Sequence, residues 1–333
     1  RQPASAEQQM VAAAHPLAAR AGREILRAGG SAIDAAVTTQ LVLGLVEPQS
    51  SGIGGGAFLL RYDRASGEVA AFDGRETAPM AATPALFLKD DGTPMGFWDA
   101  VVGGRSVGVP GTLAMLEKAH ARHGKLPWAR LFEPAIELAR EGFRVTPRLH
   151  KLIENDRFLK TYAPARDYFY TQAGAPLPVG HLLKNPAYAR TLETVAREGA
   201  RAFYEGAIAR AIVRTVRRAE GNPGKLSRRD MAQYAAKIRP ALCRPYRDHT
   251  ICGHPPPTSG GATTLQILGI LENFDLAGIQ PMGVEAVHLL AEASRLAFAD
   301  RNRFLADSDF VDVPLKRLLS DAYLGRRADL IDP

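Results

Sequence analysis

A helix that is apolar on nearly every side is the feature that most limits how this chain can fold. This helix is expected to start at Ser31, and Asp34 follows three positions later, in the pattern of a capping box. Alanine, valine and leucine then occupy most positions instead of forming one stripe. Such a helix is stable only when other elements surround it, so we expect it to be buried. A chain of 333 residues with 46% hydrophobic residues can supply that core.

Strand and helix signals occur without the regular strand–helix–strand order of a parallel sheet. Residues 57–62 and 68–72 are two apolar runs joined by Ala65, Ser66 and Gly67, which predicts an antiparallel hairpin. After Pro110 the pattern is mostly helical, so the class predicted is α+β. No long linker, repeat or low-complexity tract divides the chain, and residues 1–333 are expected to form a single domain. Pro16 and Gly29-Gly30 bracket one expected helix, and a second is expected to start at Ser31 and to run through Val42. Further helices are expected at 111–123, 134–141, 147–160, 187–198, 203–219, 227–236, 262–273 and 284–305.

Charge and hydropathy argue against two classes of partner. The formal net charge is +7, but the basic residues of segments such as 208–218 alternate with apolar positions, which is typical of a solvated helix face. Aromatic residues do not interleave with them, so a nucleic-acid surface is not expected. No apolar run approaches the roughly 18 residues needed to span a bilayer, so no membrane span is expected.

Arg75 is the strongest candidate for a binding residue. It lies in residues 73–79, Asp-Gly-Arg-Glu-Thr-Ala-Pro, directly after the predicted hairpin. A planar guanidinium can hold a carboxylate with two parallel hydrogen bonds, which a lysine cannot do. The alternative is a surface ion pair with Glu76 or Asp73. The functional interpretation is a site for a small molecule that carries a free carboxylate.

Several long segments of the chain, in the same order, resemble the large subunit of the γ-glutamyltransferases. The first is residues 47–60, Glu-Pro-Gln-Ser-Ser-Gly-Ile-Gly-Gly-Gly-Ala-Phe-Leu-Leu, and the second is residues 73–79. A third, residues 255–261, reads Pro-Pro-Pro-Thr-Ser-Gly-Gly before an apolar helix. Together the segments are far more specific than any one glycine run. Further matching segments are 25–37, 106–112, 133–139 and 297–301.

The resemblance implies a fold, a site and a partner. It implies the large-subunit part of the four-layer αββα sandwich of N-terminal-nucleophile hydrolases, completed by a small subunit from the same precursor. The activity implied is cleavage of the γ-glutamyl amide of glutathione, with transfer of the group to water or to an acceptor amine and without a cofactor. Arg75 is implied to bind the α-carboxylate of the γ-glutamyl group. In this family the oxyanion donors and the contacts to the substrate's α-amine belong to the small subunit.

The catalytic nucleophile is expected on the partner chain. In the family, self-cleavage before a Thr-Thr-His motif frees an N-terminal threonine, whose α-amine activates its own hydroxyl. The sequence contains no Thr-Thr-His. The pairs Thr38-Thr39 and Thr263-Thr264 lie inside apolar helical patterns, where the hydroxyls are expected to bond a preceding carbonyl. Neither pair is a candidate nucleophile.

The two cysteines are placed to face each other across a second hairpin. Cys243 and Cys252 flank two short runs around Arg247 and Asp248, and a two-residue turn there makes the cysteines directly opposed. Opposed strand residues lie about 4.5 to 5.5 Å apart, within disulfide range. Two buried thiols are the alternative.

Three other motifs give only weak indications of a functional site. Residues 104–108 match the nucleophile elbow Gly-x-Ser-x-Gly, but only a short apolar run precedes them and Pro110 delays the helix. His120 and His123 have metal-compatible spacing without a third ligand, so solvated histidines are expected and no metal site. The glycines at 54–56 lack a phosphate-binding frame and are expected to allow a tight turn with close backbone approach.

Two rival functions and the location remain open at this stage. A β-lactam side-chain acylase, such as a cephalosporin or glutaryl acylase, shares the fold and the self-processing. A non-catalytic protein that binds amino-acid-like ligands is the more distant alternative. The chain begins at Arg1 with a polar lead, which favours a processed, exported protein. The bacterial members that it resembles are typically periplasmic or secreted, and the same location is expected here.

Overall fold

The computed structural model describes residues 5–332. The chain divides into two compact units, one formed by the residues up to Ala57 with 74–236, and one formed by 58–73 with 237–333. Helices and antiparallel strands occur together, as expected for the predicted α+β class. The expected single domain refers to this chain completed by a small subunit, and it stays a prediction.

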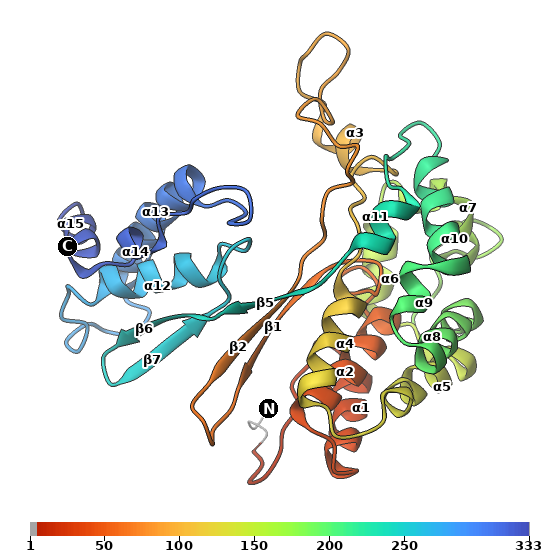
Figure 1. Ribbon diagram of the computed structural model, residues 1–333, viewed down its shortest axis with the longest axis horizontal. Helices are drawn as coiled ribbons and strands as arrows, with labels where there is room; N and C mark the ends of the chain where they lie inside the picture. The colour runs from red at the N-terminus through yellow and green to blue at the C-terminus, as the bar shows by residue number, and fades with distance from the viewer. Residues whose placement is uncertain (1–4, 333) are drawn as a thin grey trace. The chain divides into compact units, whose positions relative to one another are not determined.

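The buried helix is present at the centre of the first unit. Helix α2 (Ala32–Val46) packs against helix α1 (Pro16–Arg27), which precedes it in the chain (Figure 1). Helices α4 (Thr112–His123) and α5 (Glu133–Glu141) also contact α2. The predicted capping box forms at its start, since the backbone N–H groups of Ser31 and Asp34 each donate to the other's side chain. Nine of its residues are buried, from Ile33 to Val46. The prediction of a buried helix is confirmed.

Three of the other predicted helices of this unit differ from expectation, and the one predicted at 227–236 ends at Gln233. The helix predicted at 147–160 ends at Asn155, because the Asp156 carboxylate accepts hydrogen bonds from the backbone N–H groups of Phe158 and Leu159 and forms a turn. The helix predicted at 203–219 is broken at Gly206, whose φ of 71° is unsuited to a continuous helix. The remaining elements of the unit are α3 (Phe97–Val101), η1 (Trp128–Phe132), β3 (Phe143–Arg144), α6 (Pro147–Asn155), η2 (Leu159–Thr161), α7 (Ala163–Phe169), β4 (Leu182–Leu183), α8 (Pro186–Glu198), α9 (Arg201–Tyr204), α10 (Gly206–Arg217) and α11 (Arg228–Gln233).

The second unit contains a three-stranded sheet in the order β1-β2-β5. Strands β1 (Ala57–Tyr62) and β2 (Val69–Gly74) are the predicted hairpin, which is confirmed. Strand β5 (Lys237–Pro240), which the sequence pattern did not predict, pairs antiparallel with β2, so that Asp73 lies opposite Lys237. The last strand of the hairpin is therefore held on both sides before the chain reaches Arg75.

The rest of the second unit is a hairpin covered by helices. Strands β6 (Leu242–Tyr246) and β7 (His249–Gly253) pair antiparallel, and α12 (Gly260–Leu271) packs on them and on α13 (Val284–Phe304) (Figure 1). Two short helices, α14 (Leu315–Leu318) and α15 (Asp321–Ala328), close this part of the chain. Within residues 5–332, no helix combines the length and the hydropathy needed to cross a membrane. The core of this unit includes Ile270, Leu271, Leu289, Ala293, Leu296, Leu324, Ala328 and Ile331.

Candidate carboxylate-binding site

The backbone that carries Arg75 is held by close packing of two glycines. Arg75 follows Gly74, the last residue of β2. A Cβ at Gly74 would lie 2.6 Å from the Met115 Cβ, and one at Gly111 would lie 2.1 Å from the Gly74 carbonyl oxygen. No real side chain tolerates such contacts, so the end of β2 can press against the start of α4 only because both residues are glycine.

A pair of stacked tyrosines holds the main chain of Arg75 from another direction. The Tyr234 hydroxyl donates a hydrogen bond of 2.8 Å to the Arg75 carbonyl oxygen. The Tyr234 ring stacks on Tyr204 with centroids 5.7 Å apart, and the Tyr204 hydroxyl donates to the Pro110 carbonyl oxygen. Burial raises the pKa of the Tyr204 phenol, so it stays protonated and remains a donor. The position of Arg75 is therefore fixed through its backbone.

The Arg75 side chain itself is mostly exposed. Its exposed fraction is 62%, and its Nε lies 3.6 Å from Oε2 of Glu76. This is the ion pair of the alternative interpretation of Arg75, and it is only partly exposed, because 33% of the Glu76 side chain is accessible and its Oε2 is buried. A fixed backbone with a solvent-accessible guanidinium is the arrangement that a carboxylate-binding residue needs.

A polar cavity of about 530 Å³ lies beside Glu76, along the glycine segment. A Cβ at Gly56 would meet Oε2 of Glu76 at 2.4 Å, so the Glu76 side chain lies directly on the glycine backbone. The Gly55 carbonyl oxygen accepts hydrogen bonds from the backbone N–H groups of Gly111 and Thr112 at the start of α4. The prediction of close approach is confirmed at Gly56, whereas a Cβ at Gly54 would meet nothing within 4 Å. The cavity is lined by Gln40, Pro48, Ser50, Ser51, Gly52, Gly54, Gly55, Gly56, Ala57 and Glu76.

The weaker motifs have structural roles. Ser106 lies in a loop between α3 and α4 and donates to the Val101 carbonyl oxygen, so residues 104–108 form no nucleophile elbow. The expectation of a solvated His120 is wrong: only 17% of its side chain is exposed, and Nε2 lies 2.8 Å from the Leu126 carbonyl oxygen. Within residues 5–332, no cluster of three or more His, Cys, Asp or Glu side chains is placed to hold a metal ion.

The threonine pairs lie within helices α2 and α12, as expected, but the hydroxyls of the first pair have other partners than expected. Thr38 donates to the Leu131 carbonyl oxygen at 2.8 Å and Thr39 to that of Ala18 at 3.5 Å, so both bond other elements and not the preceding turn. That part of the expectation is wrong, because neighbouring helices bring carbonyls within reach. Thr263 is buried in α12.

The two cysteines lie in the second unit and are joined. Cys243 and Cys252 are directly opposed in the β6–β7 ladder, with an S–S distance of 2.07 Å and Cα atoms 4.1 Å apart. Sequence register alone was enough to place them together. They are part of a hairpin of the second unit.

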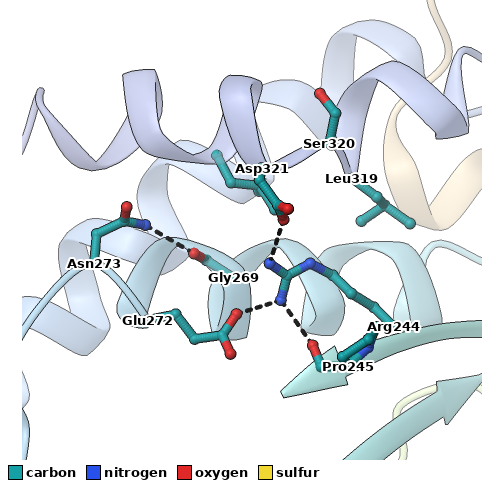
Figure 2. Close-up of a pocket in the computed structure, with 9 residues that line it drawn as sticks. Arg244, Pro245, Gly269, Glu272, Asn273, Leu319, Ser320 and Asp321 are labelled. Carbon is teal, nitrogen blue, oxygen red and sulfur yellow. Dashed lines mark hydrogen bonds and ion pairs between the residues drawn. The ribbon is translucent and has the colours of Figure 1, made fainter. Parts of the chain in front are cut away.

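A second cavity, of about 690 Å³, lies beside this hairpin, and Figure 2 shows its lining. Arg244 of β6 points into it and forms ion pairs with Glu272 at the end of α12 and with Asp321 at the start of α15 (Figure 2). Two carboxylates already neutralise this guanidinium, so it is poorly suited to bind an anionic ligand. We interpret Arg244 as a clamp that joins the hairpin to two helices of the second unit.

Comparison with solved structures defines the fold class. The chain superposes on the gamma-glutamyltranspeptidase of Helicobacter pylori with a TM-score of 0.95 and 33% identity, covering 100% of this chain and 94% of that one. It superposes on a cephalosporin acylase from Bacillus halodurans with a TM-score of 0.84 and 29% identity, covering 100% of this chain and 62% of that one. These neighbours have the N-terminal-nucleophile hydrolase fold, which confirms the predicted fold class.

Comparison of sequences then defines the family. The profile described as "Gamma-glutamyltranspeptidase" matches residues 18–333, and the chain belongs to this family. It is 38% identical to the "Glutathione hydrolase proenzyme" of Bacillus subtilis (strain 168) over 323 residues, 97% of this chain and 54% of that protein. It is 40% identical to the "Acylase ACY 1 proenzyme" of Pseudomonas sp. (strain SE83) over 338 residues, 100% of this chain and 60% of that protein. The chain thus spans little more than half the length of these relatives.

Proposed function

We propose that this chain is the large subunit of an enzyme that cleaves the γ-glutamyl amide of glutathione and related compounds. The observation that carries the proposal is Arg75, whose guanidinium is exposed while its backbone is fixed by Gly74 and Tyr234. A guanidinium held in this way can bind the α-carboxylate of a γ-glutamyl group with two parallel hydrogen bonds. Membership of the gamma-glutamyltranspeptidase family supports this ligand.

The role of Arg75 in the reaction is to position the substrate. With the α-carboxylate held, the γ-carbonyl carbon is placed for attack by the N-terminal threonine of a small subunit, which forms a γ-glutamyl-enzyme intermediate. The α-amine of that threonine accepts the hydroxyl proton, the amine of the leaving group departs, and water or an acceptor amine then resolves the ester. Misplacement of reacting atoms by about an ångström can cost on the order of a hundredfold in rate, so a fixed Arg75 backbone matters.

The partner in this proposal is a second chain from the same precursor. The relatives named as proenzymes are longer than this chain, which covers 54% and 60% of the two compared above. An exposed apolar stripe on α13 is also consistent with a covering partner: Val284 is 89%, Val287 51% and Leu290 52% exposed. The opposite face of α13 packs in the core of the second unit. We propose that the small subunit covers this stripe.

The proposed location is the periplasm or the exterior of the cell. Disulfides persist in oxidising compartments and are rare in the bacterial cytosol. The bond between Cys243 and Cys252 supports an oxidising location.

A β-lactam side-chain acylase is the second candidate, favoured by the 40% identity to an acylase proenzyme. Glutaryl and γ-glutamyl groups both end in a carboxylate that Arg75 can bind, and they differ in the α-ammonium group. The two functions therefore differ in the contacts that recognise the α-ammonium group.

The test is to assay the processed two-chain enzyme with a γ-glutamyl anilide and with a glutaryl cephalosporin. We expect kcat/KM to be higher for the γ-glutamyl donor. A higher kcat/KM for the glutaryl substrate would assign the acylase function. A correctly processed enzyme that cleaves neither compound would contradict both, and binding of glutamate without turnover would support the non-catalytic alternative.

A further inference from the structure

A network of ion pairs surrounds the strand that leads to Arg75. Arg239 of β5 donates from Nε to Oδ2 of Asp73 at 2.7 Å. Its Nη1 and Nη2 donate to the two carboxylate oxygens of Asp309, at 3.0 and 2.6 Å. Lys237 adds a bond of 2.6 Å from Nζ to Oδ2 of Asp309. The charges of Asp73, Lys237, Arg239 and Asp309 therefore balance within one connected cluster.

Burial and geometry make this network stronger than an ordinary surface pair. The exposed fraction of the side chain is 13% for Arg239 and 6% for Asp73. The fork of Arg239 binds Asp309 in the bidentate arrangement that fixes orientation as well as distance. Hydrogen bonds from Arg239 and Lys237 hold the pKa of the Asp309 carboxyl well below its usual range, so it stays ionised at neutral pH.

The network joins three pieces of the second unit. Asp73 is the penultimate residue of β2, and it lies opposite Lys237 in β5. Asp309 lies in the loop that follows α13, where its backbone N–H donates to the Asp307 side chain. The loop is thus attached to the sheet at the end of β2 that leads directly into Gly74 and Arg75.

We propose that Arg239 and Asp309 are positioning residues for Arg75, acting through Asp73. The backbone of residues 73–75 has few ways to move when Asp73 is held by Arg239, Gly74 is packed against Met115, and the Arg75 carbonyl is held by Tyr234. Release of Asp73 would leave the guanidinium of Arg75 able to bind a carboxylate, but in a wider range of orientations. This inference rests on the proposed function, because it concerns the substrate contact of Arg75.

The experiment compares variants of the processed two-chain enzyme with a γ-glutamyl anilide. Arg239→Lys keeps the charge but loses the fork, and Asp309→Asn keeps the shape but loses the charge. For each we expect KM for the donor to rise about fivefold with kcat changed by less than about twofold, because a shifted carboxylate contact weakens binding before it alters the chemical step. Arg295→Lys is the matched control, since Arg295 binds the Glu292 carboxylate through Nε and Nη2 on the surface of α13.

A double-mutant cycle separates positioning from general stability. In the Arg75→Lys background, Arg239→Lys should raise KM much less than it does in the wild type, because the bidentate contact that it positions is already lost. Additive effects on KM, or a lowered melting temperature with KM unchanged, would overturn the inference. If Arg239→Lys fails to mature, Asp309→Asn and Lys237→Gln provide the same comparison. A wild-type enzyme without γ-glutamyl activity would instead overturn the proposed function, and the inference with it.

Discussion

At the scale of single residues, Arg75 combines a backbone that is fixed with a side chain that is 62% exposed. We predict that Arg75→Lys in the processed enzyme raises KM for γ-glutamyl donors at least about tenfold, since losing one charge-assisted hydrogen bond costs on the order of 1.5 to 3 kcal/mol. Maturation should continue, because lysine keeps the positive charge that faces Glu76. Steady-state kinetics measures the effect.

Donors that lack the α-carboxylate provide the control for Arg75→Lys. They never make the lost contact, so their turnover should barely change. An equal loss for donors with and without the carboxylate, or a precursor that no longer matures, would make Arg75 a structural residue. The γ-glutamyl proposal would then lose its anchor in this chain.

Gly56 offers a test of how the glycine segment supports Glu76. Gly56→Ala would place a Cβ 2.4 Å from Oε2 of Glu76 and 2.7 Å from the Gly74 carbonyl oxygen. We expect a loss of about 1 to 3 kcal/mol in the free energy of unfolding, because the backbone of Gly74 must shift. Gly54→Ala is the matched control, since its Cβ would meet nothing within 4 Å. Urea denaturation of both variants measures the difference, and equal stabilities would contradict this account.

Only part of the site could be predicted at this scale. Arg75 stands in a recognisable motif next to a predicted strand, so its position and its chemistry were both accessible. Tyr234 bonds a residue 159 positions away, and Asp309 pairs with Arg239 70 positions away. No local pattern marks such pairs, because tertiary packing alone brings them together.

At the scale of elements, the sequence predicts best where one local cause decides the structure. The capping box and apolar pattern of α2, and the turn between β1 and β2, act over a few residues, and both elements are confirmed. The helix predicted at 147–160 was too long because a single Asp156 side chain competes for backbone N–H groups. Strand β5 was missed because it is a strand only by pairing with β2.

The β6–β7 hairpin carries a prediction of its own. Cys243 and Cys252 should be disulfide-bonded in oxidised protein, and the bond should add at most about 2 to 3 kcal/mol to the free energy of unfolding, because it closes a short loop. Alkylation followed by mass spectrometry should detect no free thiol before reduction and two after it. Two free thiols in carefully oxidised, unreduced protein would contradict the pairing.

At the scale of the whole molecule, the proposed active site needs residues from two chains. Arg75 can hold a carboxylate, whereas the threonine pairs of this chain lie within helices α2 and α12 and the serine of residues 104–108 is bonded in a loop. The relatives compared above extend well beyond the region that this chain matches. In the proposed reaction the nucleophile comes from a second polypeptide.

We predict that purified residues 1–333 do not hydrolyse a γ-glutamyl anilide or transfer its γ-glutamyl group. Activity should appear when the chain is produced together with a second chain that begins in threonine, and replacing that threonine by alanine should abolish it, because the hydroxyl is the nucleophile. Turnover by residues 1–333 alone would show that this chain carries its own nucleophile, and the two-chain proposal would fail.

The second chain should also cover the apolar stripe of α13. Val287→Glu, which puts a charge into the proposed interface, should therefore weaken co-purification of the two chains. Arg295→Lys on the same helix keeps its charge and should leave co-purification unchanged.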